Sequence, residues 1–237
     1  MNSTTVLTFT GPVPVAAAAA SQWVEITLNS GGHSQHVALS GGRITRAFLT
    51  HVAQFSLERR IPWASTHFYW ADERCVPPGH TDSNYAVAQT CFFAPLKINP
   101  DQVHRIQGEM GPDQAAQEAC ETLLSHVPVH DGIPVLDLVF LGMGEDGHVA
   151  SLFPGGLAPN ASDGPFRAVI GPKPPAQRVT MTYPVLIAAR QVWVLVSGSG
   201  KKQAWEASLQ GGGQTPLGWI LQHRNRTTVF LDESALD

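Results

Sequence analysis

Short apolar runs alternate along the chain with segments whose apolar residues recur at helical spacing. The runs predict strands over residues 36–40, 67–70, 135–141, 167–170, 191–197 and 227–231. The helical spacing predicts helices from residue 16 and over residues 43–56, 83–88, 112–125, 148–153, the second half of 178–190, 201–209 and 215–223. Strands that alternate with helices throughout predict an α/β fold, a mostly parallel sheet with helices on both faces.

No repeat or domain-splitting linker interrupts this alternation, so we expect a single domain over residues 1–237. The apolar stretch at residues 13–20 contains Pro14 and is too short for a bilayer, which needs about 20 apolar residues. No basic region precedes that stretch, as it would in a secretory leader. We therefore expect neither a membrane partner nor a cleaved leader.

Charge and cysteine content exclude several classes of protein. The chain has 15 Lys and Arg against 19 Asp and Glu, a formal charge of −4, and it has no basic run, so we expect no nucleic-acid partner. Its three cysteines, Cys75, Cys91 and Cys120, are widely spaced and form no C-x-x-C pair. They predict neither a disulfide framework nor a zinc site, and they favour a cytoplasmic location. The ten histidines include no H-x-H or H-E-x-x-H, so we expect no metal.

Three predicted strands end in glycine-rich turns, after Ser40, after Leu141 and after Ser197. In an open parallel sheet, ligands bind beyond the carboxyl ends of the strands. We therefore expect these three turns to meet at one edge of the sheet.

Two of the turns have the features of anion sites. In Ser40-Gly41-Gly42-Arg43 the glycines let backbone N–H groups approach an anion at the start of a helix, and Ser40 and Arg43 add a hydroxyl and a charge. In the turn after Ser197, Lys201 begins a predicted helix, where a cation opposes the helix dipole unless an anion is bound nearby. The simpler alternatives are a packed turn and a solvated lysine.

The third turn, LGMGEDGH at residues 141–148, contains G-x-G-x-x-G after a strand. A dinucleotide site needs a full helix after these glycines, and Pro154 stops the predicted helix too early, so we reject that interpretation. The turn instead presents Asp146 and His148. A carboxylate beside an imidazole can fix its tautomer and make it a better base. A structural histidine is the alternative.

Polar residues Asp72, Glu73 and Arg74 follow the aromatic strand at residues 67–70. They could form a structural salt bridge, which contributes little at a surface. In the functional alternative Asp72 is a base or orienting carboxylate, and Arg74 binds an oxyanion or phosphate.

Together these segments resemble the 6-phosphogluconolactonase family, within the superfamily of glucosamine and galactosamine 6-phosphate isomerases. The resemblance spans nearly the whole chain, in the order that the family keeps. The ASLFPG ending and the DER sequence resemble the lactonases, whereas the related glucosamine-6-phosphate deaminases have a GHIAFNEP-like ending and DEY. The resembling segments are VALSGGRITRAFL (37–49), YWADERCVPPGHTDSNY (69–85), LDLVFLGMGEDGHVASLFPG (136–155), PKPPAQRVTMT (172–182) and VSGSGKKQA (196–204).

The resemblance implies a modified Rossmann-like sheet and hydrolysis of 6-phospho-D-glucono-1,5-lactone to 6-phospho-D-gluconate, the second step of the oxidative pentose phosphate pathway. It implies no cofactor, and a small phosphorylated lactone as the partner. It implies His148 as the catalytic histidine, which activates water as a general base. The other implied catalytic residues are Asp146, Asp72 and Arg74, and the implied phosphate ligands are Ser40, Gly41, Gly42, Lys201, Arg178 and, less securely placed, Arg167.

One departure concerns Arg43, which stands where the family usually has a hydroxyl after the glycines. Arg43 either supplies charge to the phosphate or points to solvent. Two other functions stay open at this point: a glucosamine-6-phosphate deaminase with Asp72 as base, and a sugar-phosphate sensor without catalysis. The sequence does not fix the oligomeric state, although we favour a monomer.

Overall fold

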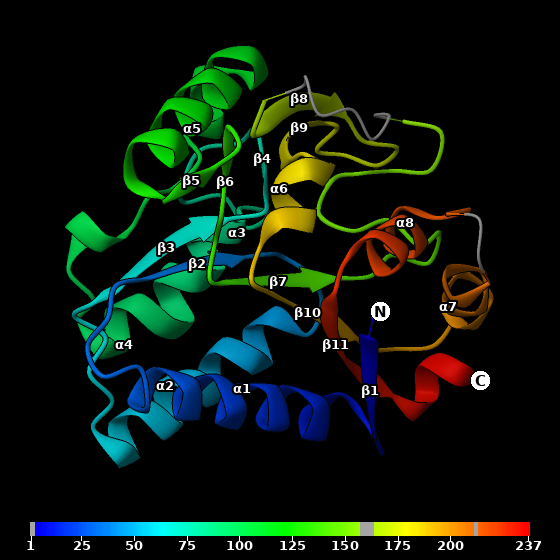
Figure 1. Cartoon of the computed structure of the whole chain (residues 1–237), viewed down its shortest axis with the longest axis horizontal. Coiled ribbons are helices and arrows are strands. Elements are labelled where there is room, and N and C mark those ends of the chain that lie inside the picture. Colours follow the sequence, from blue (N-terminus) through cyan, green and yellow to red (C-terminus); the bar gives the residue numbers. More distant parts are fainter. Residues whose placement is uncertain (1–2, 157–163, 211–212) are drawn as a thin grey trace.

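The computed structural model describes residues 3–156, 164–210 and 213–237 (Figure 1). Its centre is a sheet in which all neighbouring strands pair in parallel. The strands lie in the order β1 (Ser3–Phe9), β11 (Arg226–Asp232), β10 (Gln191–Val196), β7 (Leu138–Gly142), β2 (Gln35–Leu39) and β3 (Thr66–Trp70).

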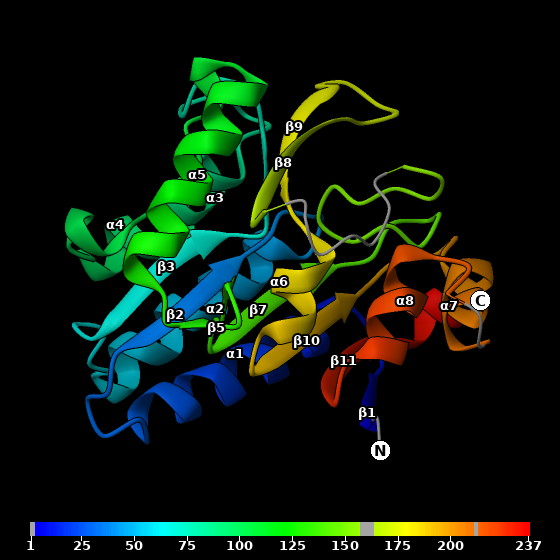
Figure 2. The same ribbon diagram turned by 45° about the horizontal axis from the view of Figure 1, so that its top comes forward.

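Helices cover both faces of this sheet, as the sequence predicted. Figures 1 and 2 show α1 and α2 on one face, with α5 and α6 on the opposite face. The α-helices are α1 (Pro12–Leu28), α2 (Thr45–Arg59), α3 (Asn84–Ala88), α4 (Ala94–Leu96), α5 (Pro112–His126), α6 (Tyr183–Ala188), α7 (Lys202–Leu209) and α8 (Pro216–His223). The other helical turns are the π-helix at Gln89–Phe93 and 3-10 turns at Pro100–Gln102, Gly108–Met110 and Glu233–Leu236.

A second, antiparallel sheet lies beyond the carboxyl end of β3 and was not predicted. It pairs β4 (Asp72–Arg74) with β9 (Gln177–Met181), and β9 with β8 (Phe166–Ile170). A two-stranded hairpin, β5 (Val129–His130) with β6 (Ile133–Pro134), follows α5. The small sheet matters for function because it brings Asp72, Arg74 and Arg178 to the same edge.

Aromatic packing under α1 and α2 fixes the main sheet. The Trp23 ring from α1 lies 4.8 Å from the Phe140 ring of β7, and Phe48 of α2 lies 4.8 Å from the same ring. All three side chains are buried. Small residues Ala16 and Ala19, two turns and one turn before Trp23, let α1 approach the sheet closely. Strand β7 is buried on both faces, which explains its continuous apolar sequence.

The structure corrects one helix that the sequence predicted and adds one strand that it did not. Residues 148–153 form turns and an isolated bridge between Val149 and Leu152, because Gly147 (φ 79°) and Ala150 (φ 49°) are left-handed and a right-handed helix cannot include them. Strand β1 was missed because its mostly exposed residues form no apolar run. Pairing with β11 holds it at the sheet edge.

All three cysteines are free. In the described part of the chain, no helix combines the length and the hydrophobicity that a membrane crossing requires.

Candidate active site

A cleft of about 580 Å³ opens beyond the carboxyl ends of β2, β3, β7 and β10. The turns that begin at Ser40, Gly142 and Ser197 all line it, so the predicted convergence of the three turns is confirmed. The small sheet adds Asp72 and Arg178 to the lining.

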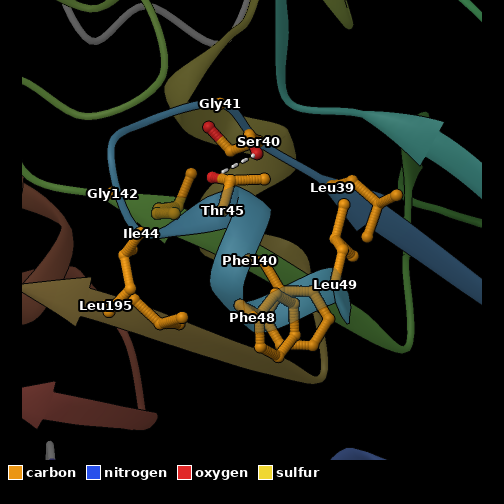
Figure 3. Close-up of a pocket in the computed structure, with 11 residues that line it drawn as sticks. Leu39, Ser40, Gly41, Ile44, Thr45, Phe48, Leu49, Phe140, Gly142 and Leu195 are labelled. Atoms are coloured by element: carbon orange, nitrogen blue, oxygen red, sulfur yellow. Dashed lines mark hydrogen bonds between the residues drawn. The ribbon is translucent and has the colours of Figure 1, made fainter. Parts of the chain in front are cut away.

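The turn after β2 rests on an apolar base. Figure 3 shows Ile44, Phe48 and Leu195 beneath it, and the Thr45 hydroxyl donates to the Ser40 carbonyl at 3.2 Å. Above this base, Gly41 is required for space, because a Cβ there would lie 2.0 Å from Asn84 Oδ1. The turn therefore keeps a fixed shape with its backbone facing the cleft.

The turn after β7 pairs a carboxylate with an imidazole. Asp146 Oδ1 lies 2.5 Å from His148 Nδ1 and accepts the His148 backbone N–H at 3.1 Å. Burial on its own raises the pKa of Asp146, but the hydrogen bonds from His148 outweigh it and the pKa lies below its usual value. Gly144 makes room for this pair, since a Cβ there would lie 2.0 Å from His148 Nδ1.

Asp72 is a buried acceptor for side chains from three different segments. It is 4% exposed. Its Oδ1 accepts from the Ser40 hydroxyl at 3.1 Å and from Asn84 Nδ2 at 3.5 Å, and its Oδ2 accepts from the Ser151 hydroxyl at 2.7 Å. The proton of the Ser40 hydroxyl is thus directed to Asp72.

Cations outnumber carboxylates around the cleft. Lys201 is 9% exposed, and burial, followed by repulsion from Arg43, lowers its pKa to about 8. Arg43 reaches across the mouth to Glu145 at 2.6 Å. Five cations and three carboxylates line the cleft, namely Arg43, Arg74, Lys173, Arg178 and Lys201 with Asp72, Glu145 and Asp146. This excess of positive charge favours an anionic ligand.

Arg178 is held rigidly at the wall of the cleft. Its Nε donates to the Pro175 carbonyl at 3.1 Å and its Nη2 to the Lys173 carbonyl at 3.3 Å. Its guanidinium lies 5.6 Å from the centre of the Phe153 ring. The centre of the same Phe153 ring lies 4.8 Å from that of the His148 ring. Burial, and then the charge of Arg74, lowers the pKa of Arg178, which a bound anion would relieve.

Ten of the residues proposed from the sequence line this cleft, namely Ser40, Gly41, Gly42, Arg43, Asp72, Arg74, Asp146, His148, Arg178 and Lys201. Arg167 does not line the cleft. It is exposed on β8, opposite Thr180, so the structure does not bring it together with the other predicted site residues.

Sequence reasoning missed Lys173, Phe153, Asn84 and Ser151. Lys173 lies within a segment that resembles the family, but its charge alone did not distinguish it from a surface lysine. The other three also lie within resembling segments, but their contacts with Arg178, Gly41 and Asp72 join segments far apart in the chain, for which the sequence carries no local signal. Within the described ranges, no three His, Cys, Asp or Glu side chains come together as metal ligands do.

The fold and the cleft define an α/β protein with a cation-rich cleft beside a histidine–carboxylate pair. The chain belongs to the family of glucosamine-6-phosphate isomerases and 6-phosphogluconolactonases, whose model matches residues 13–230.

Curated relatives carry lactonase names. The chain is 38% identical over 208 residues to 6-phosphogluconolactonase 3, chloroplastic, of Arabidopsis thaliana, which covers 84% of this chain and 63% of the relative. It is 35% identical over 193 residues to 6-phosphogluconolactonase of Treponema pallidum, covering 80% of this chain and 79% of the relative. The match thus spans somewhat less than two thirds of the plant protein.

Solved structures agree in fold. The crystal structure of a devB protein superposes with a TM-score of 0.86 at 31% identity, covering 97% of this chain and 98% of the other. The structure of 6-phosphogluconolactonase from Trypanosoma brucei gives 0.85 at 27% identity, covering 99% and 98%. A monomeric glucosamine-6-phosphate deaminase gives 0.82 at 16% identity, covering 98% and 100%, which shows the shared fold alone.

Proposed function

We propose that this chain hydrolyses 6-phospho-D-glucono-1,5-lactone to 6-phospho-D-gluconate, the second step of the oxidative pentose phosphate pathway. The lactonase names of the relatives support the substrate. The observation that carries the proposal is the contact between His148 and Asp146, at 2.5 Å, within a cleft rich in cations. A phosphorylated sugar lactone needs both features, a base for the carbonyl and a positive site for the phosphate.

In the proposed reaction His148 acts as the general base. Asp146 accepts a hydrogen bond from the protonated Nδ1, which leaves Nε2 as the basic nitrogen. Nε2 takes a proton from water as the water oxygen bonds to the lactone carbonyl carbon. The bond from that carbon to the ring oxygen then breaks, and His148 returns its proton to the departing C5 oxygen. A general base of this kind typically contributes about 10²- to 10⁴-fold in rate.

Charge in the cleft supports the other requirements of this reaction. We assign the developing carbonyl oxyanion to Arg74 and to backbone N–H groups of the turn at residues 142–147. We assign the phosphate to the backbone at Gly41 and Gly42 and to Lys201 and Arg178, with Lys173 as an added candidate. Asp72 then serves by holding Ser40 and Ser151 in place.

The test is acid release from freshly generated lactone, corrected for its spontaneous hydrolysis. Hydrolysis well above the spontaneous rate supports the proposal, and no acceleration contradicts it. Ammonia release from glucosamine 6-phosphate would instead identify a deaminase, which uses a carboxylate such as Asp72 as base. The three donors on Asp72 favour the lactonase, because they hold it as a fixed acceptor. Binding of 6-phosphogluconate without turnover would identify a sensor.

A cytoplasmic location, a monomeric state and a single domain over the whole chain stay predictions. Cell fractionation, light scattering and limited proteolysis test them in turn.

A further inference from the structure

Glu73, next to Asp72, is a buried carboxylate that the proposed reaction does not use. It is 3% exposed. Its Oε1 accepts the backbone N–H groups of Arg74 and Asn84, each at 2.8 Å. Its Oε2 accepts the Tyr85 backbone N–H at 2.8 Å and the Ser83 hydroxyl at 3.0 Å. Four donors thus satisfy one carboxylate, and three of them lie at the start of α3.

The consequence of this arrangement is the position of Asn84, the first residue of α3. Asn84 is 5% exposed. Its Nδ2 donates to the Asp72 carbonyl at 2.8 Å and to Asp72 Oδ1 at 3.5 Å. Its Oδ1 faces Gly41 so closely that a Cβ at Gly41 would lie only 2.0 Å from this oxygen. One amide side chain therefore separates the Asp72 carboxylate from the glycine turn.

Asp72 and Gly41, the two residues that Asn84 contacts, line the cleft, whereas Asn84 itself does not. The Ser40 hydroxyl also donates to Asp72, so the carboxylate, the glycine turn and Asn84 form a closed set of contacts. Displacement of any one of them displaces the others, because buried polar groups keep their hydrogen-bond partners.

We propose that Asn84 is a positioning residue of the active site, which fixes the Asp72 carboxylate and the phosphate-binding turn at Gly41 relative to each other, and that Glu73 holds Asn84 in place. This inference rests on the proposed lactone hydrolysis. It assigns Glu73 and Asn84 no contact with the substrate.

Removal of the amide tests the first part. In Asn84→Ala, Asp72 Oδ1 loses a donor and the turn at Gly41 loses its neighbour, so we expect kcat/KM to fall about tenfold or more. Asn99→Ala is the control for loss of an asparagine side chain, because Asn99 caps a 3-10 turn that lies away from the cleft. Thermal unfolding of both variants reports whether they remain folded.

A carboxyl in place of the amide gives a readout that a merely structural role would not produce. In Asn84→Asp the new carboxyl lies beside Asp72, and the two anions repel each other at neutral pH. At lower pH one shared proton restores a donor to Asp72. We expect the activity of this variant, relative to wild type at the same pH, to rise as the pH falls, while the ratio for Asn84→Ala stays flat.

The contact with Gly41 provides a second, independent test. Gly41→Ala alone places a methyl group against Asn84 Oδ1 and should abolish most activity. In the double variant Gly41→Ala/Asn84→Ala the space is restored, so the double variant should be more active than Gly41→Ala.

The role of Glu73 is tested by Glu73→Gln. This substitution places N–H groups against some of the four donors, and we expect a fall in kcat/KM similar to that of Asn84→Ala.

The outcomes separate this inference from the proposed function. If the wild-type chain does not hydrolyse the lactone, the proposed function fails first. If the wild type is active and folded Asn84→Ala behaves like Asn99→Ala, the positioning role is wrong. Loss of activity in Gly41→Ala that the second substitution does not relieve, or a pH-independent Asn84→Asp ratio, would also overturn it.

Discussion

His148 Nδ1 lies 2.5 Å from Asp146 Oδ1, and the same oxygen also accepts the His148 backbone N–H. Two bonds to one oxygen fix both the ring plane and the tautomer with a proton on Nδ1, the nitrogen that faces the carboxylate. The basic lone pair is then on Nε2. The glycine-rich turn thus holds its imidazole in one orientation, and the Leu217 backbone N–H of α8 anchors the turn at the Gly147 carbonyl.

The first prediction concerns the base itself. His148→Ala should lower kcat by at least about a hundredfold, because one general base contributes about that much or more. KM should change little, since the phosphate contacts remain. Steady-state lactone hydrolysis measures both constants, and exposed His130→Ala provides the control. A His148→Ala enzyme with the wild-type rate would exclude the proposed mechanism.

The second prediction uses the space beside the imidazole. Gly144→Ala puts a methyl group where His148 Nδ1 now lies, and the ring must leave Asp146 to make room. We expect kcat to fall by about the same factor as in His148→Ala, in a protein that still folds. Gly79→Ala is the matched control, because a Cβ at Gly79 meets nothing within 4 Å. Wild-type activity in Gly144→Ala would show that the contact of His148 with Asp146 is dispensable.

Much of the site could be predicted because the three turns follow strands of one parallel sheet. Ser40, Gly142 and Ser197 are remote in sequence, yet a parallel sheet brings all carboxyl ends to one edge. The periodicity of the apolar residues determines the strands, and the topology follows from their alternation with helices. The residues of these turns that were predicted from this logic alone do line the cleft.

The unpredicted parts depend on contacts that have no local signature. The sequence at residues 177–181 resembles neither a long buried strand nor a helix, and it is a strand because β4 and β8 pair with it. The same pairing places Arg178 opposite Arg74 at the cleft. Arg167 is also on this sheet, at a position that leaves it outside the cleft, and only the strand register distinguishes the two.

The third prediction concerns Lys201, whose pKa lies near 8 because the side chain is buried and faces Arg43. Below that pH the amine is a cation and attracts phosphate, and above it the charge is lost. The Kd for 6-phosphogluconate should therefore rise about tenfold or more between about pH 7 and pH 9. Calorimetric titration across this range measures it without interference from lactone breakdown. Lys201→Arg should remove most of the pH dependence, and an equally steep rise in that variant would refute this role.

The fourth prediction concerns the ion pair between Arg43 and Glu145, which spans the mouth of the cleft. The bond from Arg43 holds the pKa of Glu145 below its usual value, so the pair is charged at neutral pH. Both side chains are well exposed, and such pairs contribute little to stability. Glu145→Gln should free Arg43 for the phosphate and lower KM about threefold, with the melting temperature unchanged.

The double variant Arg43→Gln/Glu145→Gln provides the check on this fourth prediction. If Arg43 binds the phosphate, the second substitution cancels the gain in KM. If Arg43 only points to solvent, Arg43→Gln leaves KM as it is in either background. Steady-state kinetics of the four proteins distinguish the two cases.

Four histidines form a row of neighbouring rings at the other end of the sheet from the cleft, toward α5. His67 Nδ1 lies 3.1 Å from His104 Nε2, and the His104 ring lies 4.6 Å from that of His126. On the other side, His36 is 5.5 Å from His67 between ring centres. Burial, and then the neighbouring imidazoles, lowers the pKa of His104 to about 4. Burial also lowers the pKa of His67 and His36, although Asp137 opposes it at His36.

The fifth prediction follows from this row, which should make the protein sensitive to mild acid. In the unfolded chain these imidazoles take up protons near pH 6.5, whereas in the folded chain His104 stays neutral down to about pH 4. Folding stability is therefore complete above about pH 6.5 and falls as the pH drops toward 4. As the pH drops from 7 to 5, His104 alone lowers the free energy of unfolding by about 1 to 2 kcal/mol.

Urea unfolding at the two pH values should show a smaller loss in His104→Phe, which keeps the ring stacked on Tyr69 but cannot titrate. An equal loss in His104→Phe and in the wild type would rule out this origin, and exposed His130→Phe serves as the control.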